Sequence, residues 1–216
     1  MNLEFKKRII TSLILLTLLV FMYFYSFILI ISLIIIAVIS WIEFYGLISK
    51  IFNKNNILRF VFKSFSMIYL SLIVFGLLYI ISSKPELKIF FVYSILVSIA
   101  SDVGGLVFGK LFKGRRLTKI SPKKTIWGSV GSFTFSFLLI PFFLELIFNH
   151  EIISLFIITI FISLTTQLGD LFISFIKRKA KVKNTSDLLP GHGGVLDRID
   201  GIIFAIPIGY LLLNYF

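Results

Sequence analysis

The chain has 216 residues, of which 58% are hydrophobic, and its formal net charge is +12. Apolar runs of about 20 residues or more recur along it, which is the length that a helix needs to cross a bilayer, so a soluble protein is excluded. The sequence contains no cysteine, which excludes disulfides and thiolate metal sites. We therefore expect an all-α, polytopic membrane protein that forms a single domain over residues 1–216.

The apolar runs predict about seven transmembrane helices. The first run, residues 9–42, is too long for one span and predicts a hairpin that turns near Tyr25 and Ser26. No cleavage site of a signal peptide follows the basic N-terminal residues, so this end is expected to remain on the protein. The other five spans are expected at residues 60–81, 89–109, 130–148, 152–176 and 202–216.

Several spans carry residues that disfavour an uninterrupted apolar helix. Asp102, Gly104 and Gly105 are expected to interrupt the last turns of the fourth span, and Pro141 to break the fifth. Glu43 closes the second span, where it is either part of a site or an end-of-helix residue. We favour the second reading, because an acid at a helix end reaches water at low cost.

Basic residues gather on one side of the seven-span arrangement. The N-terminal segment carries three, and the loops after the second, fourth and sixth spans carry four, seven and five, whereas the other side has only Lys84 and Lys88. Since Lys and Arg concentrate in cytoplasmic loops, we place the N-terminus and these loops in the cytoplasm, and the protein in the cell membrane. The positive charge then faces the anionic headgroups of a lipid bilayer, and no nucleic-acid partner is expected.

The densest polar stretch, residues 167–200, holds four of the ten carboxylates and six of the 22 Lys and Arg residues. Asp170 lies where an apolar span ends, a position that is costly for an acid and usually functional. Residues 190–194 (PGHGG) form a loop whose glycines let the backbone approach a ligand and turn its N–H groups toward an anion. Asp197 and Asp200 follow on one helix face. Acids beside such a loop and a basic cluster suit a Mg²⁺-nucleotide.

Two functional assignments in this stretch stay open. The basic residues at the end of the sixth span are either phosphate ligands or a juxtamembrane anchor, and for Lys179 and Lys181 the two readings weigh equally. His192 is expected to donate to a phosphate or to order its loop, because no nucleophile in the sequence needs a general base.

Three parts of the chain carry motifs: WIEFY at 41–45, SDVGG at 101–105 with ISPKKT at 120–125, and PGHGGVLDRID at 190–200. They resemble motifs of the phosphatidate cytidylyltransferases, the CDP-diacylglycerol synthases of membrane lipid synthesis. The resemblance implies that CTP and phosphatidate give CDP-diacylglycerol and pyrophosphate, with Mg²⁺ as cofactor and a site that faces the cytoplasm. A homodimer stays open.

The resemblance also assigns roles to single residues. Metal would be held by Asp170 and Asp197, with Asp200 as a third ligand or a neighbour of the ligands. The catalytic residues implied are Asp170, Lys177, Arg178, Asp197, Arg198 and Asp200. The substrate-binding residues implied are Asp102, Ser121, Lys123, Lys124, Thr125, Ser174, Lys183, Gly191, His192, Gly193 and Gly194.

The chain departs from the family's pattern at three positions. Asn184 stands where the family usually has Asp, Trp127 where it has Glu, and Gly201 where it has Ser. Because the core acids are intact, these changes bear on efficiency or substrate preference, and Asp187 could partly replace the lost charge.

Four alternatives stay open. A catalytically weakened family member is the first. A CTP-dependent kinase of a polyprenol-type alcohol is the second, and it would release CDP instead of pyrophosphate. A non-enzymatic carrier is the third, although it gives no reason for the acids beside the glycine-rich loop. In the fourth, Asp170 and Asp197 pair separately with Lys177 and Arg198 and hold the loop instead of a metal.

Overall fold

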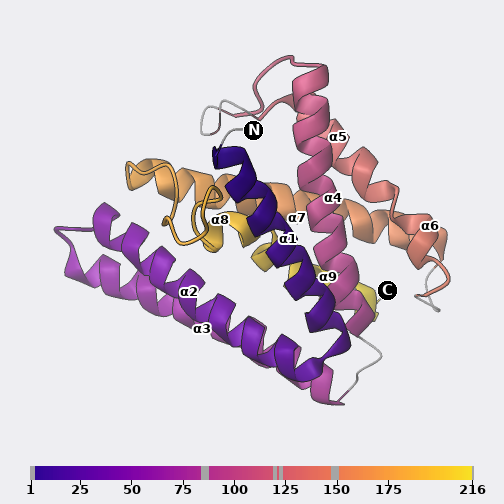
Figure 1. Cartoon of the computed structure of the whole chain (residues 1–216), viewed down its shortest axis with the longest axis horizontal. Helices are drawn as coiled ribbons and strands as arrows, with labels where there is room; N and C mark the ends of the chain where they lie inside the picture. Colours follow the sequence, from indigo (N-terminus) through magenta and orange to yellow (C-terminus); the bar gives the residue numbers. More distant parts are fainter. Residues whose placement is uncertain (1–2, 84–87, 119–120, 122–123, 147–150, 216) are drawn as a thin grey trace. The chain divides into compact units, whose positions relative to one another are not determined.

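The computed structural model describes residues 3–83, 88–118, 121, 124–146 and 151–215, and these residues contain helices and no β-strand. Helices are favoured because backbone groups in an apolar environment must pair within their own segment. The expected all-α class is confirmed for the described residues. The helices, shown in Figure 1, are α1 (Leu3–Phe24), α2 (Ser26–Ile51), α3 (Asn56–Ser83), α4 (Lys88–Leu111), α5 (Ile126–Phe137), α6 (Ile140–Phe143), α7 (Ile152–Lys179), α8 (Leu196–Ile199) and α9 (Ile202–Tyr215).

Within the described residues, five helical stretches are long and apolar enough to cross a membrane, and they correspond to the second to sixth predicted spans. The apolar part of α1, Leu13–Phe24, is shorter, and α9 has 14 residues. The chain is thus an integral membrane protein, whereas the count of seven spans and the cytoplasmic N-terminus stay predictions. The five stretches are Ser26–Ile51, Asn56–Ile80, Lys88–Leu111, Ile126–Phe143 and Ile152–Lys179.

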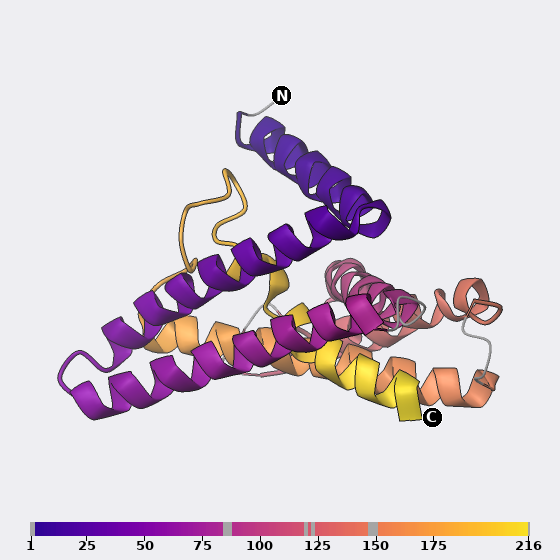
Figure 2. The same ribbon diagram turned by 90° about the horizontal axis from the view of Figure 1, so that it is seen from below.

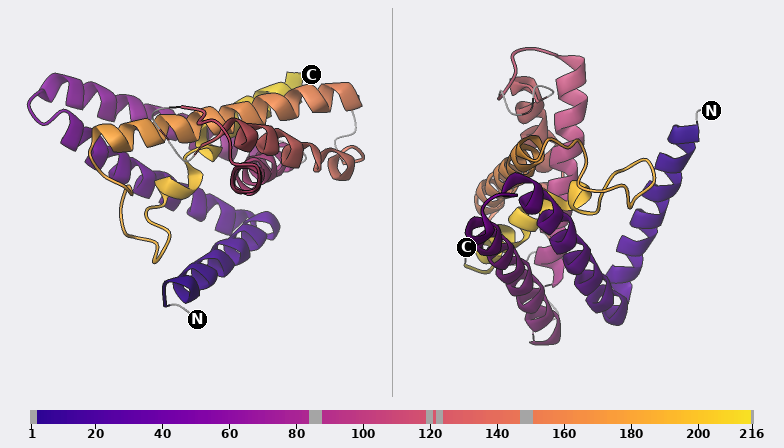
Figure 3. Two further views of the ribbon diagram at one scale, coloured as in Figure 1. Left: turned by 90° about the horizontal axis from the view of Figure 1, so that it is seen from above. Right: turned by 90° about the vertical axis from the view of Figure 1, so that its left-hand side faces the viewer.

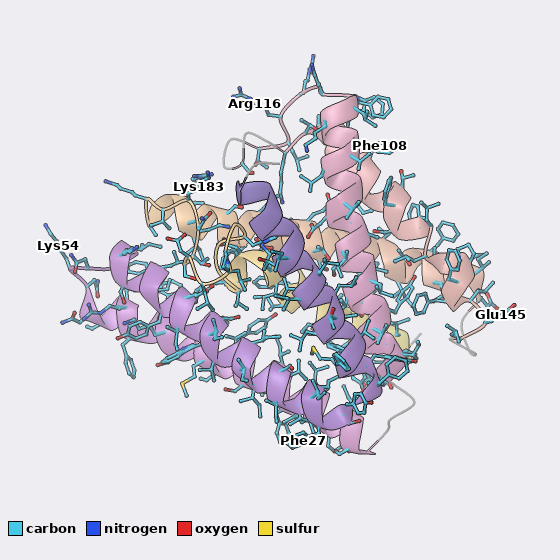
Figure 4. The ribbon with its side chains drawn as sticks, in the orientation of Figure 1. Phe27, Lys54, Phe108, Arg116, Glu145 and Lys183 are labelled. Carbon is cyan, nitrogen blue, oxygen red and sulfur yellow. The ribbon has the colours of Figure 1, made fainter. Side chains whose placement is uncertain are left out.

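Two helical hairpins open the chain. The predicted turn near Tyr25 and Ser26 is confirmed, because Tyr25 is extended (φ −115°, ψ 103°) between α1 and α2. α2 and α3 form the second hairpin, whose two antiparallel arms are seen in Figure 2. Asn55 begins α3 by accepting a hydrogen bond from the Leu58 N–H at 3.0 Å. Lys54 extends outward from this turn in Figure 4.

α4 and α5 approach closely because glycines take the place of side chains at their contact. A Cβ on Gly104 would overlap the Gly131 carbonyl oxygen, and a Cβ on Gly105 would lie 2.8 Å from the Ser132 hydroxyl. Small residues commonly let helices associate in this way in membranes. The prediction that Asp102, Gly104 and Gly105 interrupt the span is therefore wrong: α4 continues to its end, and its glycines face α5.

The predicted break at Pro141 is confirmed, because α5 ends at Phe137 and Pro141 lies in the first turn of α6. α5 begins earlier than residue 130, at Ile126. Thr125 precedes it in an extended conformation and accepts a hydrogen bond from the Gly128 N–H at 3.0 Å, which is an N-cap.

The chain forms two compact units, unit 1 (Met1–Ser83 with Ile176–Ile199) and unit 2 (Lys84–Phe175 with Asp200–Phe216). α7 contributes its last turn to unit 1, where Leu47, Ile176 and Ala180 form a small buried cluster. The main core of unit 2 surrounds Tyr93, whose side chain is fully buried. The expectation of a single domain stays a prediction.

Candidate functional site

The loop after α7 folds back on itself within unit 1 and leads into α8 (Figure 3). Leu189 and Gly193 pair as an isolated antiparallel bridge, with a Leu189 N–H bond of 2.8 Å to the Gly193 carbonyl. Gly191 and Gly193 have φ values of 77° and 85°, which side chains disfavour. Thr11 of α1 donates to the Pro190 carbonyl at 3.0 Å. Residues 190–194, called the glycine loop below, are thus a closed turn.

The backbone N–H groups that follow Gly191 all donate within unit 1. Those of His192 and Gly193 donate to the Leu189 carbonyl at 2.9 and 3.1 Å. The Gly194 N–H donates to Asp197 Oδ2 at 3.0 Å. Those of Val195 and Leu196 donate to the Glu43 carboxylate at 3.0 and 2.8 Å. Three of these five amides thus donate to the protein's own carboxylates and two donate to a carbonyl, and phosphate binding by the loop stays a prediction.

Glu43 of α2 holds the segment around the glycine loop in place through hydrogen bonds. Its carboxylate accepts four hydrogen bonds, two from the amides of Val195 and Leu196 and two from hydroxyls, Thr185 at 2.7 Å and Ser186 at 2.6 Å. Glu43 is only 7% exposed. The expectation that Glu43 reaches water at the helix end is therefore wrong: the carboxylate turns into unit 1, where four donors replace its hydration.

A side chain at position 194 would collide with this carboxylate. An added Cβ on Gly194 would overlap both Glu43 oxygens and the Thr185 hydroxyl. The second glycine of the Gly193-Gly194 pair is thus required by the close approach of an acid from α2, while the first is required by its positive φ.

The Asp197 carboxylate contacts three other residues of unit 1. Lys177 lies 2.6 Å from Oδ1, and Oδ2 accepts from the Thr185 N–H at 2.8 Å, the Thr185 hydroxyl at 3.0 Å and the Gly194 N–H at 3.0 Å. Burial by itself raises the pKa of Asp197, but the Lys177 ammonium and the two backbone amides outweigh it and leave this pKa below its usual value. The Thr185 N–H donates to Asp197, and the single Thr185 hydroxyl proton is shared between Glu43 and Asp197, so the two acids form one network.

This lowered pKa predicts how stability depends on pH. Because the folded state binds the Asp197 proton more weakly than the unfolded state, the stabilisation is complete above the unfolded pKa and is lost as pH falls through the folded pKa. We expect Asp197→Asn to lower the unfolding midpoint in detergent at pH 7, and the gap to the parent to narrow below about pH 4. Asp187→Asn, at an exposed site, is the control. A gap of constant size from pH 7 to pH 3 would contradict this assignment.

The other predicted basic residues of unit 1 lie around this network. Arg198 donates through Nε to the His192 carbonyl at 3.1 Å and is exposed. Arg178, Lys181 and Lys183 are exposed as well, and Lys183 is labelled in Figure 4. The predicted alternative, in which Asp170 and Asp197 pair separately with Lys177 and Arg198, is only partly met: Asp197 pairs with Lys177, whereas Asp170 pairs with Lys124 and Arg198 bonds a carbonyl.

In unit 2, Asp170 of α7 has its own partners. Lys124 lies 2.5 Å from Oδ2, and the Ser174 hydroxyl donates to Oδ1 at 3.2 Å. Lys124 is held in place because the loop before α5 closes on itself, with a Leu117 N–H bond of 2.8 Å to the Lys124 carbonyl. The predicted residues Lys124, Asp170 and Ser174 are thus brought together, whereas Thr125 acts as the N-cap of α5.

Hydrogen bonds that involve hydroxyl groups connect α4 and α5 to the part of α7 that precedes Asp170. Gln167, one turn before Asp170, accepts from Ser129 and donates to Ser163 at 3.3 Å. The α4–α7 pairs are Tyr93 with Thr159 at 2.6 Å, Ser98 with Thr166 at 2.9 Å and Ser101 with Ser163 at 2.9 Å.

Of the remaining predicted residues of unit 2, Asp200 lies in a segment that packs on α7, and the other described ones lie on α4 or in the loop before α5. Asp200 is 8% exposed, and its Oδ1 accepts from the Gly201 N–H at 3.0 Å. A Cβ on Gly169 would lie 2.9 Å from the Asp200 carbonyl oxygen, so this segment packs next to Asp170. Asp102 is exposed on α4, and Ser121 is half-buried. Lys123 lies outside the described residues.

Two departures from the family's pattern have structural surroundings that explain the residue present. A Cβ on Gly201 would lie 2.6 Å from the Thr166 methyl and 2.8 Å from the Thr166 carbonyl oxygen, so glycine permits close packing on α7. The Trp127 ring packs against the Phe112 ring, with centroids 5.5 Å apart and the ring planes tilted by 35°.

Asp170 fits a divalent cation better than Asp197 does. The side chain of Asp170 is 26% exposed, whereas that of Asp197 is 6% exposed and already accepts four hydrogen bonds. Across the described ranges, no group of three or more His, Asp or Glu side chains gathers in either unit. Mg²⁺ commonly takes one or two carboxylates and completes its shell with water and phosphate, so Asp170 is compatible with it, and the metal stays a prediction.

Sequence reasoning missed Glu43, Thr185, Ser186 and Gln167 as members of these networks. The paired hydroxyls at 185 and 186, directly before the glycine loop, were a usable signal, since such residues satisfy buried acids. Gln167 in an apolar span was another.

Comparison with known proteins gives the family. The model of the cytidylyltransferase family matches residues 2–216. A phosphatidate cytidylyltransferase of Staphylococcus saprophyticus is 35% identical over 163 residues, which cover 74% of this chain and 62% of that protein. One of Staphylococcus aureus (strain COL) is 33% identical over 165 residues, with the same coverage of 74% and 62%. One of Rickettsia prowazekii is 41% identical over 139 residues, 60% of each chain. The chain spans about 60% of the length of the curated relatives it matches.

Proposed function

Because the chain belongs to the cytidylyltransferase family, we propose that it is a phosphatidate cytidylyltransferase that forms CDP-diacylglycerol and pyrophosphate from CTP and phosphatidate. The observation that carries the proposal is the family match over residues 2–216, which contains all three motif-bearing parts of the chain. The names of the relatives supply the substrates.

The proposed reaction needs charge control more than proton transfer. A phosphate oxygen of phosphatidate attacks the α-phosphorus of CTP, and the bond from that phosphorus to the bridging oxygen breaks as pyrophosphate leaves. The attacking oxygen is already an anion, so a general base is unnecessary and repulsion between phosphates is the main obstacle. Mg²⁺, held by Asp170, would supply charge neutralisation and orientation when bound. Asp197 and Asp200 are proposed to assist it.

We propose that the lysines of the two networks neutralise the charge of the substrate phosphates. Lys124 and Lys177 each lie on a motif aspartate, at 2.5 and 2.6 Å. Each ammonium would donate to phosphate oxygens of the substrates, and Asp170 would hold the cation. Arg178 and Arg198 are exposed near the same segment of unit 1 and would orient the phosphates.

The direct test is the purified protein in mixed micelles with CTP, phosphatidate and Mg²⁺. We expect equimolar CDP-diacylglycerol and pyrophosphate, and no turnover when EDTA replaces Mg²⁺. CDP formed with a polyprenol acceptor would select the kinase alternative, and binding of CTP without turnover would select a weakened family member.

Arg178 and Lys181 separate phosphate contacts from a general basic field. Arg178→Ala should lower kcat/KM by about 10- to 100-fold, the loss of one or two charge-assisted hydrogen bonds. Lys181→Ala is the matched control, because Lys181 is exposed and has a φ of 58°, which Lys and Ala tolerate equally poorly. It should keep kcat/KM within about twofold. Equal losses would show that the cluster acts only through its field.

We also propose that both motif-bearing loops face the cytoplasm, as the loop charges favour. The chain has no cysteine, so single cysteines at Arg115 and Lys183, both exposed, can be labelled in intact cells and inverted vesicles. Both should react with an impermeant maleimide only in inverted vesicles. Glu151→Cys, directly before α7, should react only in intact cells. Labelling of the first two from opposite faces would refute this topology.

A further inference from the structure

An apolar groove runs between α2 and α3, inside unit 1. Its volume is about 300 Å³, at the lower end of the roughly 300–1,000 Å³ typical of ligand pockets. Ala37, Val38 and Trp41 line it from α2, and Leu70, Val74 and Leu78 line it from α3. Val38 is 52% exposed, so the groove is open at the surface of the α2–α3 hairpin.

Next to Trp41, at one end of the groove, lie a second aromatic ring and a cation. The Trp41 indole N–H donates to the Lys63 carbonyl at 3.2 Å, which fixes the ring across the hairpin. One turn further along α2, the Tyr45 ring lies beneath the Lys63 ammonium, 3.0 Å from its centroid. Aromatic rings and Lys or Arg side chains at this level are typical of the membrane interface.

Lys63 is available to an anion from outside the protein. Across the residues that the structure describes, no carboxylate lies within ion-pair distance of its ammonium, which contacts the Tyr45 ring instead. Arg59, one turn earlier on α3, is bonded to Asn56, also a neutral group, at 2.7 Å. The groove therefore has an apolar floor and a cationic end, which complements an acyl chain joined to an anionic headgroup.

The groove is separate from the glycine loop. Glu43, which bonds that loop, lies two residues from both Trp41 and Tyr45, or about 200° around α2. α2 thus presents its acid to one partner and its groove-lining residues to another.

We propose that the α2–α3 groove binds an anionic phospholipid of the bilayer, with one acyl chain along the groove and the headgroup phosphate on Lys63. This site goes beyond the proposed activity and does not depend on it. Phosphatidylglycerol serves as the test lipid.

Trp41 reports directly on occupancy, because the chain has only two tryptophans. In a Trp127→Phe background, the full chain is reconstituted into phosphatidylcholine vesicles that contain brominated phosphatidylglycerol or brominated phosphatidylcholine. Quenching of Trp41 should show about fivefold preference for the anionic lipid, the effect of one basic side chain near an anionic headgroup. Lys63→Gln should remove the preference, and Lys54→Gln, at the turn, should keep it.

Equal quenching by the two lipids would overturn the proposal, since it would indicate contact with bulk lipid only. Absence of quenching by either would also overturn it, as expected if a second copy of the chain covered the groove. A second measurement is independent of the tryptophan background. Ala37→Phe fills the groove, so native mass spectrometry in detergent should show retained phosphatidylglycerol on the parent and little on the variant. Retention at the parental level would contradict the site, provided that circular dichroism shows both proteins folded.

Discussion

Glu43→Gln should abolish most activity and destabilise unit 1. The carboxylate accepts two backbone and two hydroxyl hydrogen bonds, and an amide offers only one accepting oxygen. The amide nitrogen would then face the N–H of Val195 or Leu196, leaving a buried donor without an acceptor. We expect a loss of about 2–4 kcal/mol in the free energy of unfolding and a fall in turnover of about 100-fold or more as the glycine loop loses its position.

Hydrogen exchange measures this effect at the loop itself. The amides of Val195 and Leu196 should be protected in the parent and exchange rapidly in Glu43→Gln. Glu145→Gln, an exposed acid of unit 2 labelled in Figure 4, is the matched control and should change neither exchange nor turnover. If Glu43→Gln kept both loop protection and activity, the four contacts would be unimportant.

Asp170→Asn should remove activity by more than about 100-fold while leaving the protein folded. Asn keeps the size of the side chain and an oxygen for the Ser174 hydroxyl, but it loses the charge that a divalent cation requires. Because Asp170 is a quarter exposed, the released Lys124 can be hydrated, so the unfolding midpoint should change little.

The contrast with Asp197→Asn is the informative control. Asp197 is 6% exposed and holds Lys177, so its Asn variant should lose both stability and activity. Titration with Mg²⁺ distinguishes the roles: the parent should saturate, whereas Asp170→Asn should respond weakly even at high concentration. Normal turnover of Asp170→Asn at limiting Mg²⁺ would exclude it as a metal ligand.

Sequence patterns predicted the features that depend on local physics. The turn at Tyr25 and the break at Pro141 follow from span length and from the missing N–H of proline, and both are present. α5 begins four residues before the predicted span, because its first turn lies ahead of the continuous apolar run, and Thr125 is an ordinary N-cap residue that marks this start.

Features that depend on distant parts of the chain could not be predicted. Glu43 reads as a helix-end acid until residues 185–196 are folded against α2. Gly104 reads as a helix breaker until α5 packs on it, and Lys124 reads as one base among many until the loop closes beside Asp170. The motifs located the acids and the glycine loop, but only tertiary contacts show which partner each one takes.

The closure of the glycine loop by Glu43 and Asp197 has a consequence for ligand binding. Five successive amides, from His192 to Leu196, already have acceptors before any nucleotide arrives. The conformational entropy of this segment is therefore lost during folding and not during recognition, which makes the segment preorganised. Nucleotide should then associate without a slow ordering step, and the heat capacity change on binding should be small, because little surface is newly buried.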